Sequence, residues 1–350
     1  MSFQREDVPP VITISIPVRA TFPAQSTRTI SLKDIQRPVA DELKRFQRYF
    51  RDAMRTSVPL LDHVARYLLR QKGKRIRPLL VLLTARLCGG ITEATYRAAA
   101  LVELLHSATL VHDDVVDGAE RRRGMFSINA IWKNKVAVLF GDFLLSRGLL
   151  LALEHRDYET LHALSDAVRR MSEGELLQIE KSRHLDIDEA TYFRIISDKT
   201  ASLIAACTKC GALSATDDPQ VIHEMHRMGE KLGLAFQIRD DLFDYGEDVG
   251  KPIGIDLKEK KLTLPLIYAL RVAPASERRR ILRIVRKKKK TREDIQRVAY
   301  FAEAYGGMTY ARQRMEALAH EARAILERYP PSDARQALID LVDYTVTRTR

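Results

Sequence analysis

Two short stretches of the chain each place three aspartates within five residues. The first is "HDDVVD" at 112–117 and the second is "DDLFD" at 240–244. Each follows a run in which apolar residues recur at helical spacing, so each is predicted to continue a buried helix. Carboxylates at the end of such a helix must face a cavity or carry a large desolvation penalty. A solvated helix face is the alternative interpretation, and the apolar flanks argue against it.

The spacing of the first triplet indicates a metal site. At 100° per residue, Asp113 and Asp117 lie on one face of a helix with Asp114 beside them. Converging carboxylates repel one another, and Mg²⁺, which prefers oxygen ligands, relieves that repulsion. The arginines at 121–123 follow directly, and their forked donors match phosphate oxygens. This stretch therefore predicts a magnesium–diphosphate site.

The second triplet consists of Asp240, Asp241 and Asp244, and it begins 127 residues after the first. One such triplet arises easily by chance on an acidic helix. Two copies, each after a buried helix, are expected to form facing walls of one pocket.

Seven ordered blocks of the sequence resemble the all-trans isoprenyl diphosphate synthases, the polyprenyl synthetase family, and its medium- or long-chain bacterial members above all. The blocks are "KGKRIRP" at 72–78, "LLHSATLVHDDVVD" at 104–117 with "RRG" at 122–124, "GDFLLSRG" at 141–148, "GELLQ" at 174–178, "KTASL" at 199–203, the second aspartate region, and "GKPIGIDLKEKKLTLPLIYAL" at 250–270. Two family glycines are replaced, by Lys72 and Lys260. We expect the second change to cost only a flexible glycine, because Lys261 is kept.

The resemblance implies an all-α fold, a large single-domain helical bundle of the isoprenoid synthase type with a central cavity, over residues 31–350. Residues 1–30 are expected to be an extended or disordered extension, with alternating Ile12, Ile14 and Ile16 suggesting one short strand. The pattern of apolar residues predicts helices at 38–55, 59–71, 75–88, 92–116, 136–154, 158–183, 190–213 and 219–245. Gly229 and Gly233, one turn apart, would allow close helix packing. The family relationship also suggests a homodimer.

The resemblance also implies the roles of individual residues. The metal ligands would be Asp113, Asp114, Asp117, Asp240, Asp241 and Asp244, holding Mg²⁺ as three ions, with Mn²⁺ able to substitute. The catalytic set would be Asp113, Asp114, Asp117, Lys199, Asp240 and Asp241. The allylic diphosphate would be held by Arg122, Lys199, Thr200, Gln237, Lys251 and Lys261. Isopentenyl diphosphate would be held by Lys74, Arg77, His106 and Arg123.

These roles imply a prenyltransferase that adds isopentenyl diphosphate head-to-tail to an allylic diphosphate, repeatedly. The growing tail is expected to run from Asp113 toward the N-terminus of its helix, along Thr109, Ala108, Leu105 and Val102. Small side chains at 108 and 109 point to a medium- or long-chain product, of the kind used for quinone side chains. Phe143 or Leu149 are candidates for the channel floor. Small residues that only pack against a neighbouring helix are the alternative.

Composition fits this interpretation. Apolar runs are expected to stay below the roughly 20 residues that a membrane-spanning helix needs, and the start of the chain lacks a secretory signal pattern, so a cytoplasmic location is expected. The cysteines, Cys88, Cys207 and Cys210, are interpreted as small core residues. The net charge of +12 is concentrated in "RRRILRIVRKKKKTRE" at 278–293. This run lacks interleaved aromatics, so we expect no nucleic-acid binding and at most a peripheral contact with anionic lipid.

Other functions are compatible with some of these motifs. A short-chain farnesyl or geranylgeranyl diphosphate synthase would share every motif. A class I terpene cyclase or a head-to-head coupling enzyme would share the fold and the aspartates, but would not explain Lys74, Arg77 and His106. A non-catalytic subunit of a two-chain synthase is expected to lack acidic ligands, and both triplets are intact here.

Overall fold

The computed structural model describes residues 30–71, 73–122, 124–246 and 254–348. The elements are α1 (Leu32–Gln36), η1 (Arg37–Val39), α2 (Ala40–Ala53), α3 (Pro59–Arg70), α4 (Ile76–Cys88), α5 (Glu93–Val116), β1 (Arg121–Arg122), β2 (Met125–Phe126), α6 (Ile128–Glu154), α7 (Tyr158–His184), α8 (Glu189–Ile196), η2 (Ser197–Ala201), α9 (Ser202–Leu213), α10 (Pro219–Phe243), α11 (Ile255–Lys258), α12 (Leu264–Val272), α13 (Ala275–Arg286), α14 (Arg292–Ala304), α15 (Gly307–Glu327) and α16 (Asp333–Thr347). The predicted all-α fold is confirmed.

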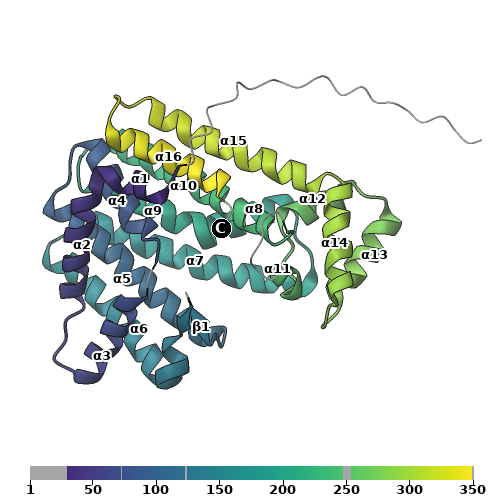
Figure 1. The fold of residues 1–350 in the computed structure, drawn as a ribbon, viewed down its shortest axis with the longest axis horizontal. Coiled ribbons are helices and arrows are strands. Elements are labelled where there is room, and N and C mark those ends of the chain that lie inside the picture. Colours follow the sequence, from purple (N-terminus) through teal and green to yellow (C-terminus); the bar gives the residue numbers. More distant parts are fainter. Residues whose placement is uncertain (1–29, 72, 123, 247–253, 349–350) are drawn as a thin grey trace, which may run out of the picture.

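The centre of the molecule is made of helices that are apolar on every side. Residues 78–85 of α4 are buried without interruption, and so are residues 201–208 at the start of α9. A helix that is hydrophobic all round can be stable in water only when other helices surround it. Here α5, α7, α10 and α16 pack around α4 and α9 (Figure 1).

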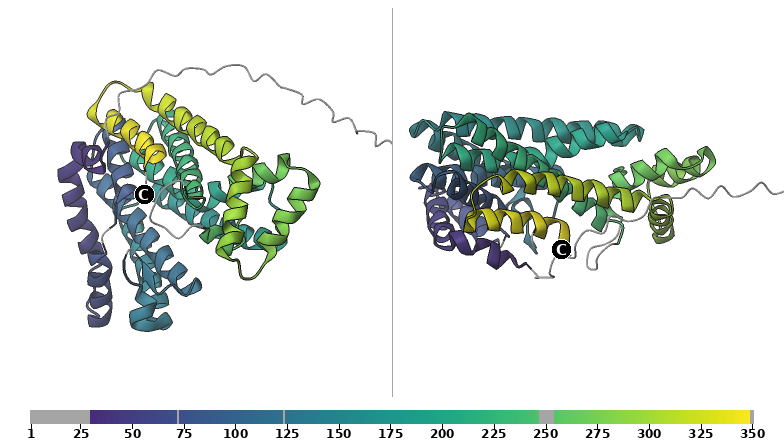
Figure 2. Two further views of the ribbon diagram at one scale, coloured as in Figure 1. Left: turned by 45° about the vertical axis from the view of Figure 1, so that its right-hand side comes forward. Right: turned by 90° about the horizontal axis from the view of Figure 1, so that it is seen from above.

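Two hydrophobic cores meet along α10. The first core lies among α2 to α6, α9 and α16, and it includes Met225 and Leu232 of α10. The second lies among α8 and α11 to α15, and it includes Ile238 and Leu242 near the other end of α10. Because α10 packs into both cores, its C-terminal end, which carries the second aspartate triplet, is held from two sides. Figures 1 and 2 show α13 and α14 at one end of the molecule, away from α2, α3 and α6.

Glycines bring α10 against its neighbours, as predicted. A Cβ atom added at Gly229 would lie 2.2 Å from Oγ1 of Thr208, and one at Gly233 would lie 2.6 Å from Cα of Ala201. Such distances are far below van der Waals contact, so larger residues would push the two helices apart. The close packing places the predicted diphosphate ligands on η2 next to those on α10.

The structure departs from the predicted helices in three places. Residues 121–126 form a two-stranded antiparallel hairpin, which a chain predicted to be helical throughout does not anticipate. The predicted helix at 190–213 is divided by the π-helical segment η2. Helix α6 begins eight residues before the predicted start and contains a non-helical residue, Lys133, with φ 71° and ψ 165°.

The expectation that no segment is long and apolar enough to cross a membrane is wrong for α6. Its 27 residues include an 18-residue window with a mean hydropathy of 1.9, of which one third is buried inside the chain. Val138, Leu139, Leu149, Leu150 and Leu153 are each 39–56% exposed. In the sequence, Asp142 and Arg147 interrupt the apolar run. In the helix, the exposed apolar residues before and after them lie on the same side.

Candidate active site

The first aspartate triplet lies at the C-terminal end of α5, and its members have different surroundings. Asp113 and Asp117 are exposed, whereas Asp114 is only 4% exposed and accepts a hydrogen bond from Arg122 Nε at 2.6 Å. The pKa of Asp113 is raised, because loss of hydration and the nearby charges of Asp117 and Glu175 disfavour its ionised form. The outer aspartates are thus available to a ligand, and the middle one is held by the protein.

The hairpin β1–β2 positions Arg122. Arg122 pairs with Met125 across the two strands, and Gly124 turns the chain with φ +79°. Tyr67 of α3 donates a hydrogen bond to the Phe126 carbonyl at 2.7 Å. Its ring packs edge-to-face with that of Trp132, and the two ring centres are 5.1 Å apart. The hairpin is therefore fixed to α3 and to the start of α6.

The second triplet repeats this arrangement at the end of α10. Asp241 is 4% exposed, and it accepts hydrogen bonds from the Tyr192 hydroxyl at 2.6 Å and from Gln237 Nε2 at 2.8 Å. Burial and the neighbouring Asp256 carboxylate raise its pKa to about 7, although both hydrogen bonds oppose that shift. Asp241, like Asp114, is a middle aspartate held by donors of the protein.

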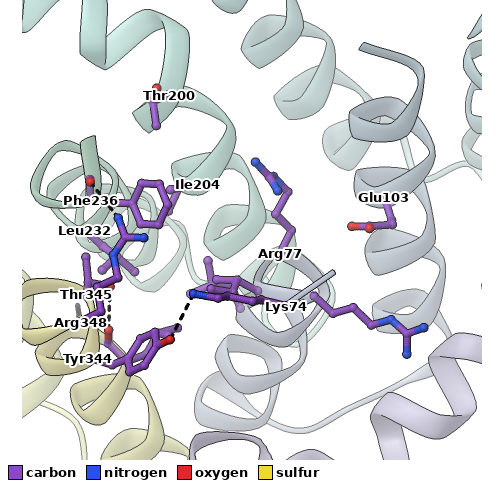
Figure 3. A pocket seen from close by; sticks show the side chains of 14 residues that line it. Lys74, Arg77, Glu103, Thr200, Ile204, Leu232, Phe236, Tyr344, Thr345 and Arg348 are labelled. Carbon is purple, nitrogen blue, oxygen red and sulfur yellow. Dashed lines mark hydrogen bonds between the residues drawn. The ribbon is translucent and has the colours of Figure 1, made fainter. Parts of the chain in front are cut away.

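Asp240 is paired with the C-terminal helix. Arg348, just after α16, places its guanidinium 2.7 Å from Oδ1 of Asp240 and 4.1 Å from the centre of the Phe236 ring. The Arg348 carbonyl accepts a hydrogen bond from Arg239 at 2.8 Å. Figure 3 shows Arg348 beside Phe236, with Tyr344 and Thr345 one turn earlier on α16. An arginine thus neutralises one of the predicted metal ligands.

Asp244 belongs to a further acidic pair that the sequence interpretation did not identify. The Asp256 amide donates a hydrogen bond to Oδ2 of Asp244 at 3.2 Å. Burial and the charge of Asp244 raise the pKa of Asp256 to about 6. Lys261 lies 3.9 Å from Asp256 and 2.5 Å from Glu259. Although burial lowers the pKa of Lys261, Glu259 and Asp256 outweigh it and raise the pKa, so this lysine is firmly cationic.

Lys199 lies electrostatically between the two aspartate regions. The pKa values of Asp113 on one side and Asp256 on the other are raised overall, and the positive charge of Lys199 opposes both shifts. It forms an ion pair with Glu175 of α7 and lies 3.5 Å from Gln178 Oε1. These relations support the prediction that the two triplets face one site, with a lysine between them.

The backbone around Lys199 is built for close contact. It lies in the π-helical segment η2, a form often found at functional sites. A Cβ atom at Gly174 of α7 would lie 2.9 Å from Cβ of Asp198 and 3.0 Å from the amide nitrogen of Lys199. Glycine at 174 therefore lets η2 rest directly on α7, which brings Lys199 to Glu175.

Four of the six predicted ligands of the allylic diphosphate share one small cavity, which Arg122 does not line. Lys199, Thr200, Gln237 and Lys261 line a space of about 80 Å³ together with Asp241 and Asp256. The Thr200 hydroxyl donates a hydrogen bond to Gln237 Oε1 at 2.7 Å. Gln237 therefore connects η2 to the second triplet.

A second cavity, of about 270 Å³, adjoins the first at Thr200 and is lined by two of the residues predicted to bind isopentenyl diphosphate, Lys74 and Arg77. Lys74 lies just before α4 and Arg77 in its first turn, and Lys74 Nζ donates a hydrogen bond to the Tyr344 hydroxyl at 3.3 Å. Figure 3 shows Arg77 reaching into the space between Thr200 and Glu103. His106, one turn after Glu103 on α5, is 6% exposed.

Several predicted site residues either lie outside the described residues or do not line the two cavities. Arg123 and Lys251, and the extension at 1–29 with its predicted strand, lie outside the described residues. Leu105 and Ala108 are buried in the first core, and Thr109 donates its hydroxyl to the His106 carbonyl at 2.9 Å. Phe143 is partly buried against Phe140. Leu149 is 40% exposed on α6, and its place at a channel floor stays a prediction.

Four residues of the site were missed from the sequence. Glu175, Tyr192, Asp256 and Arg348 each contact a predicted ligand directly or lie beside one. "GELLQ" was quoted only as a family block, and an acidic residue opposite Lys199 could have been sought there. Tyr192 and Arg348 carry no local pattern, since each reaches its partner from another helix.

The donors at the ends of α5 and α10 fit a hard divalent cation. Asp113 and Asp117 present carboxylate oxygens to solvent, and Asp240 and Asp244 are partly exposed, which is the oxygen-rich chemistry that Mg²⁺ prefers. Within residues 30–71, 73–122, 124–246 and 254–348, three or more such side chains do not converge on one preformed point. The oxygens therefore fit a cation that is shared with a diphosphate better than one enclosed by protein alone.

Comparisons with known proteins agree with this geometry. The family model described as "Polyprenyl synthetase" matches residues 58–301. The octaprenyl diphosphate synthase of Escherichia coli is 35% identical over 324 residues, which cover 92% of this chain and 100% of that protein. The crystal structure of a decaprenyl diphosphate synthase from Rhodobacter capsulatus has a TM-score of 0.86 and 34% identity, covering 91% of this chain and 100% of that one.

A polyprenyl synthase from Caulobacter crescentus, solved in complex with calcium and isoprenyl diphosphate, is 36% identical with a TM-score of 0.83, and the match covers 92% of this chain and 99% of that one. Family model, relatives and solved structures cover the same helices that carry both aspartate triplets. The chain belongs to the polyprenyl synthetase family and is a prenyltransferase.

Proposed function

We propose that the chain is a Mg²⁺-dependent trans-polyprenyl diphosphate synthase that makes a medium- or long-chain product. The observation that carries this proposal is the pair of adjoining cavities. One is lined by Lys199, Gln237 and Lys261 beside the second triplet, and the other by Lys74 and Arg77. Two diphosphates would thus bind next to each other, one beside the second triplet and one beside Lys74 and Arg77, in a cavity that Glu103 also lines.

The first cavity suits the allylic substrate. Lys199, Lys261 and Arg122 would bind its diphosphate, with Thr200 and Gln237 as hydrogen-bond partners. Asp113, Asp117, Asp240 and Asp244 would hold the metal ions, and we propose three Mg²⁺, replaceable by Mn²⁺. When bound, Mg²⁺ supplies stabilisation of the negative charge that develops on the leaving diphosphate. The Caulobacter synthase with calcium and isoprenyl diphosphate supports a divalent cation here.

The middle aspartates would have a different role from the outer ones. Asp114 is engaged by Arg122, and Asp241 by Tyr192 and Gln237. We propose that they orient these donors behind the ligands. Of the six aspartates that the family resemblance implies as metal ligands, direct ligation is thereby assigned to the outer positions, Asp113, Asp117, Asp240 and Asp244.

The second cavity suits isopentenyl diphosphate. Lys74 and Arg77 would bind its phosphates, with His106 and Arg123 assisting. The chemistry then breaks the allylic carbon–oxygen bond and releases diphosphate. The double bond of the second substrate attacks the allylic carbon, and its C2 proton passes to the departing diphosphate. The product is an allylic diphosphate longer by one unit, so the cycle can repeat.

The product length is proposed from the small side chains before the first triplet. Ala108 and Thr109 are small side chains on α5 just before the first triplet, and the octaprenyl and decaprenyl relatives support a medium or long chain. A short-chain farnesyl or geranylgeranyl diphosphate synthase is the alternative, because geranylgeranyl pyrophosphate synthases are also among the similar structures.

We also propose that two copies of the chain form a homodimer through α6. Its outward face exposes Val138, Leu139, Leu149, Leu150 and Leu153, and apolar patches of this kind usually bind another protein surface. A second copy offers the same face, as twofold dimers require. The cytoplasmic location and the boundary at residue 30 stay predictions from the sequence.

The proposed activity is tested with purified protein, Mg²⁺, farnesyl diphosphate and labelled isopentenyl diphosphate, with products sized by chromatography. We expect a ladder that ends at a medium or long chain, and no product after chelation of the metal. Asp113→Ala and Asp240→Ala should each lower turnover by orders of magnitude while the fold is kept, because each removes a metal ligand.

Asp52→Ala, on the exposed surface of α2, is the control and should behave as the parent. Activity of either site variant near that of the parent would contradict the two-wall metal site. A ladder that ends at farnesyl or geranylgeranyl diphosphate would establish the short-chain alternative.

A further inference from the structure

The most strongly charged surface of the molecule lies on α13 and the turn that follows it. Residues 275–292 contain ten lysines and arginines and one glutamate, in a chain whose net charge is +12. This segment is far richer in positive charge than the rest of the protein. None of its residues has been given a part in the proposed chemistry.

Helix α13 separates this charge from its apolar residues. Ile281, Ile284 and Val285 are buried in the second core. Arg279, Arg283 and Arg286 follow one another at spacings of four and three residues, so they form one row along the opposite face, and all three are exposed. A helix with an apolar side packed on protein and a row of arginines toward solvent presents its charge outward.

The charges on this surface are little neutralised by the protein itself. Lys287 is paired with Asp294 at 2.8 Å, and Lys290 donates to the Lys287 carbonyl. Lys288 and Lys289 are exposed, and the ion pairs found in the described part of the chain do not include them or the arginine row. Unneutralised cations on a surface attract an anionic partner.

The position of α13 and α14 allows a broad, flat partner to approach. In both views of Figure 2 these two helices lie at the end of the molecule, standing clear of α2 to α6. The arginine row faces away from the groove between α13 and α14, which is lined by Ile281, Ile284 and Tyr300. The row is therefore not used to pack these two helices together.

We propose that this basic surface, made of Arg279, Arg283, Arg286, Lys288 and Lys289, docks the enzyme on an anionic lipid bilayer. An anionic bilayer presents negative headgroups over a wide area, so it can contact the whole row of cations at once. Each lysine or arginine adds to the attraction between the protein and the bilayer. The choice of a bilayer over another anionic partner rests on the proposed function, since a polyprenyl diphosphate carries a long apolar chain that water dissolves poorly.

The surface lies near the catalytic end of the second triplet. The charge of Lys260 acts on Lys290, and a Cβ atom at Gly254 would lie 2.5 Å from Ile295 of α14. The basic turn therefore borders residues 254–261, which end at Lys261. An enzyme docked through α13 keeps its second aspartate region close to the lipid surface.

The test uses the full chain and sedimentation with vesicles of phosphatidylcholine alone or mixed with phosphatidylglycerol. We expect the parent to bind only the anionic vesicles, and less strongly as salt is raised. The variant with Arg279, Arg283, Arg286, Lys288 and Lys289 all changed to Gln should lose at least about a hundredfold in apparent vesicle affinity. Its turnover in detergent should equal that of the parent, which also shows that it is folded.

The matched control changes five exposed cations at the other end of the molecule, Lys44, Arg48, Arg51, Arg55 and Arg66, to Gln. It carries the same change in net charge and should bind vesicles as the parent does. Equal losses in both variants, or no binding of the parent to anionic vesicles, would overturn the proposal. Retention by the parent of a single-stranded oligonucleotide instead of vesicles would assign the surface to nucleic acid and also overturn it.

Two further arms separate this proposal from others. Inorganic phosphate at the concentration of the lipid phosphate should not release the parent from vesicles, and release would mean that a single phosphate group is bound instead of a bilayer. A parent that makes no polyprenyl product but still binds vesicles through this surface would contradict the proposed function and leave the docking surface standing.

Discussion

At the scale of residues, the two aspartate triplets are built alike although they share no segment of chain. In each, the middle aspartate is about 4% exposed and held by protein donors, while its neighbours have access to solvent. Burying a carboxylate that stays unpaired is costly, so Arg122 is required near Asp114, and Tyr192 and Gln237 near Asp241. In each triplet, the outer carboxylates are thus accessible to a ligand, and the buried middle carboxylate orients the protein donors.

The raised pKa of Asp241 leads to a prediction about pH and stability. Its pKa rises from an ordinary value near 4 in the unfolded chain to about 7 in the folded one. Below pH 4 both states are protonated and there is no penalty. As pH rises from 4 to 7 the folded state keeps a proton that the unfolded state loses, so this residue destabilises the fold increasingly, by at most about 4 kcal/mol above pH 7.

Asp241→Asn should therefore gain stability relative to the parent as pH is raised from 5 to 8. The measurement is urea unfolding of both proteins across this range, with EDTA present so that cations do not bind the carboxylates. The loss of one acceptor for Tyr192 adds a constant cost, which does not change with pH. A stability difference that is flat, or that shifts toward the parent as pH rises, would show that Asp241 is ionised throughout.

At the scale of elements, the first triplet and the expected product channel both depend on α5. This helix is covered by α6, where a Cβ atom at Gly148 would lie 3.0 Å from Leu101. Ala108 is fully buried, and Thr109 is only partly so. A large side chain at 108 would overpack the core, whereas one at 109 has space beside the helix.

Thr109→Phe is therefore the sharper test of product length. We expect this variant to block the channel and to shift products toward farnesyl or geranylgeranyl diphosphate, with the first condensation still running. Chromatography of labelled products measures the shift, and Thr109→Val, which keeps the volume, should leave it unchanged. An unaltered ladder from an active Phe variant would place the channel along another face.

Ala108→Phe should have the same effect on products only if it folds. Inserting a phenyl ring at a fully buried alanine costs roughly 1–3 kcal/mol or more, so a thermal melt must accompany the assay. Together the two variants separate a blocked channel from a disturbed core.

The sequence predicted elements better than it predicted their interruptions. The apolar spacing located α5, α7 and α10 within two residues at each end, because a long amphipathic or buried helix leaves a periodic signal. It did not reveal η2, since a π-helical segment has the same composition as the helices around it. The residues that cross between helices, such as Tyr192 and Arg348, were likewise invisible, because their partners are set by packing and not by spacing.

Lys260, which replaces a family glycine, costs more than the sequence led us to expect. Lys260 takes φ +61°, a left-handed conformation in which a residue with a Cβ atom costs roughly 1–2 kcal/mol. The expectation that this change loses only flexibility is therefore wrong, because the position calls for glycine on steric grounds. The strain lies directly before Lys261.

At the scale of the whole molecule, the single chain leaves two unlike surfaces without a partner. One is the apolar face of α6, and the other is the row of arginines on α13. These two helices lie toward opposite ends of the molecule (Figure 1). If the first is covered by a second copy, the two basic surfaces of a dimer are carried on the outside. Docking on a bilayer would then be strengthened by two contacts per particle.

The dimer is tested by placing charge on its proposed face. Leu139→Glu combined with Leu150→Glu should give monomers in analytical ultracentrifugation, because each buried carboxylate in the interface would lack a partner. Val272→Glu with Tyr300→Glu, at exposed residues of α12 and α14 that lie away from α6, is the matched control and should leave the dimer intact. A dimer that survives the α6 changes would place the interface elsewhere.

The packing of Trp132 has a practical consequence for spectroscopy. It is the single tryptophan of the chain, and it contacts Tyr67 and His63 at the base of the hairpin that carries Arg122. Its fluorescence therefore comes from one place, close to where the first substrate is expected to dock. Without any attached dye, emission excited at the red edge of tryptophan absorption, where tyrosine does not absorb, reports on the surroundings of the hairpin. This makes the time course of substrate capture accessible in a stopped-flow instrument.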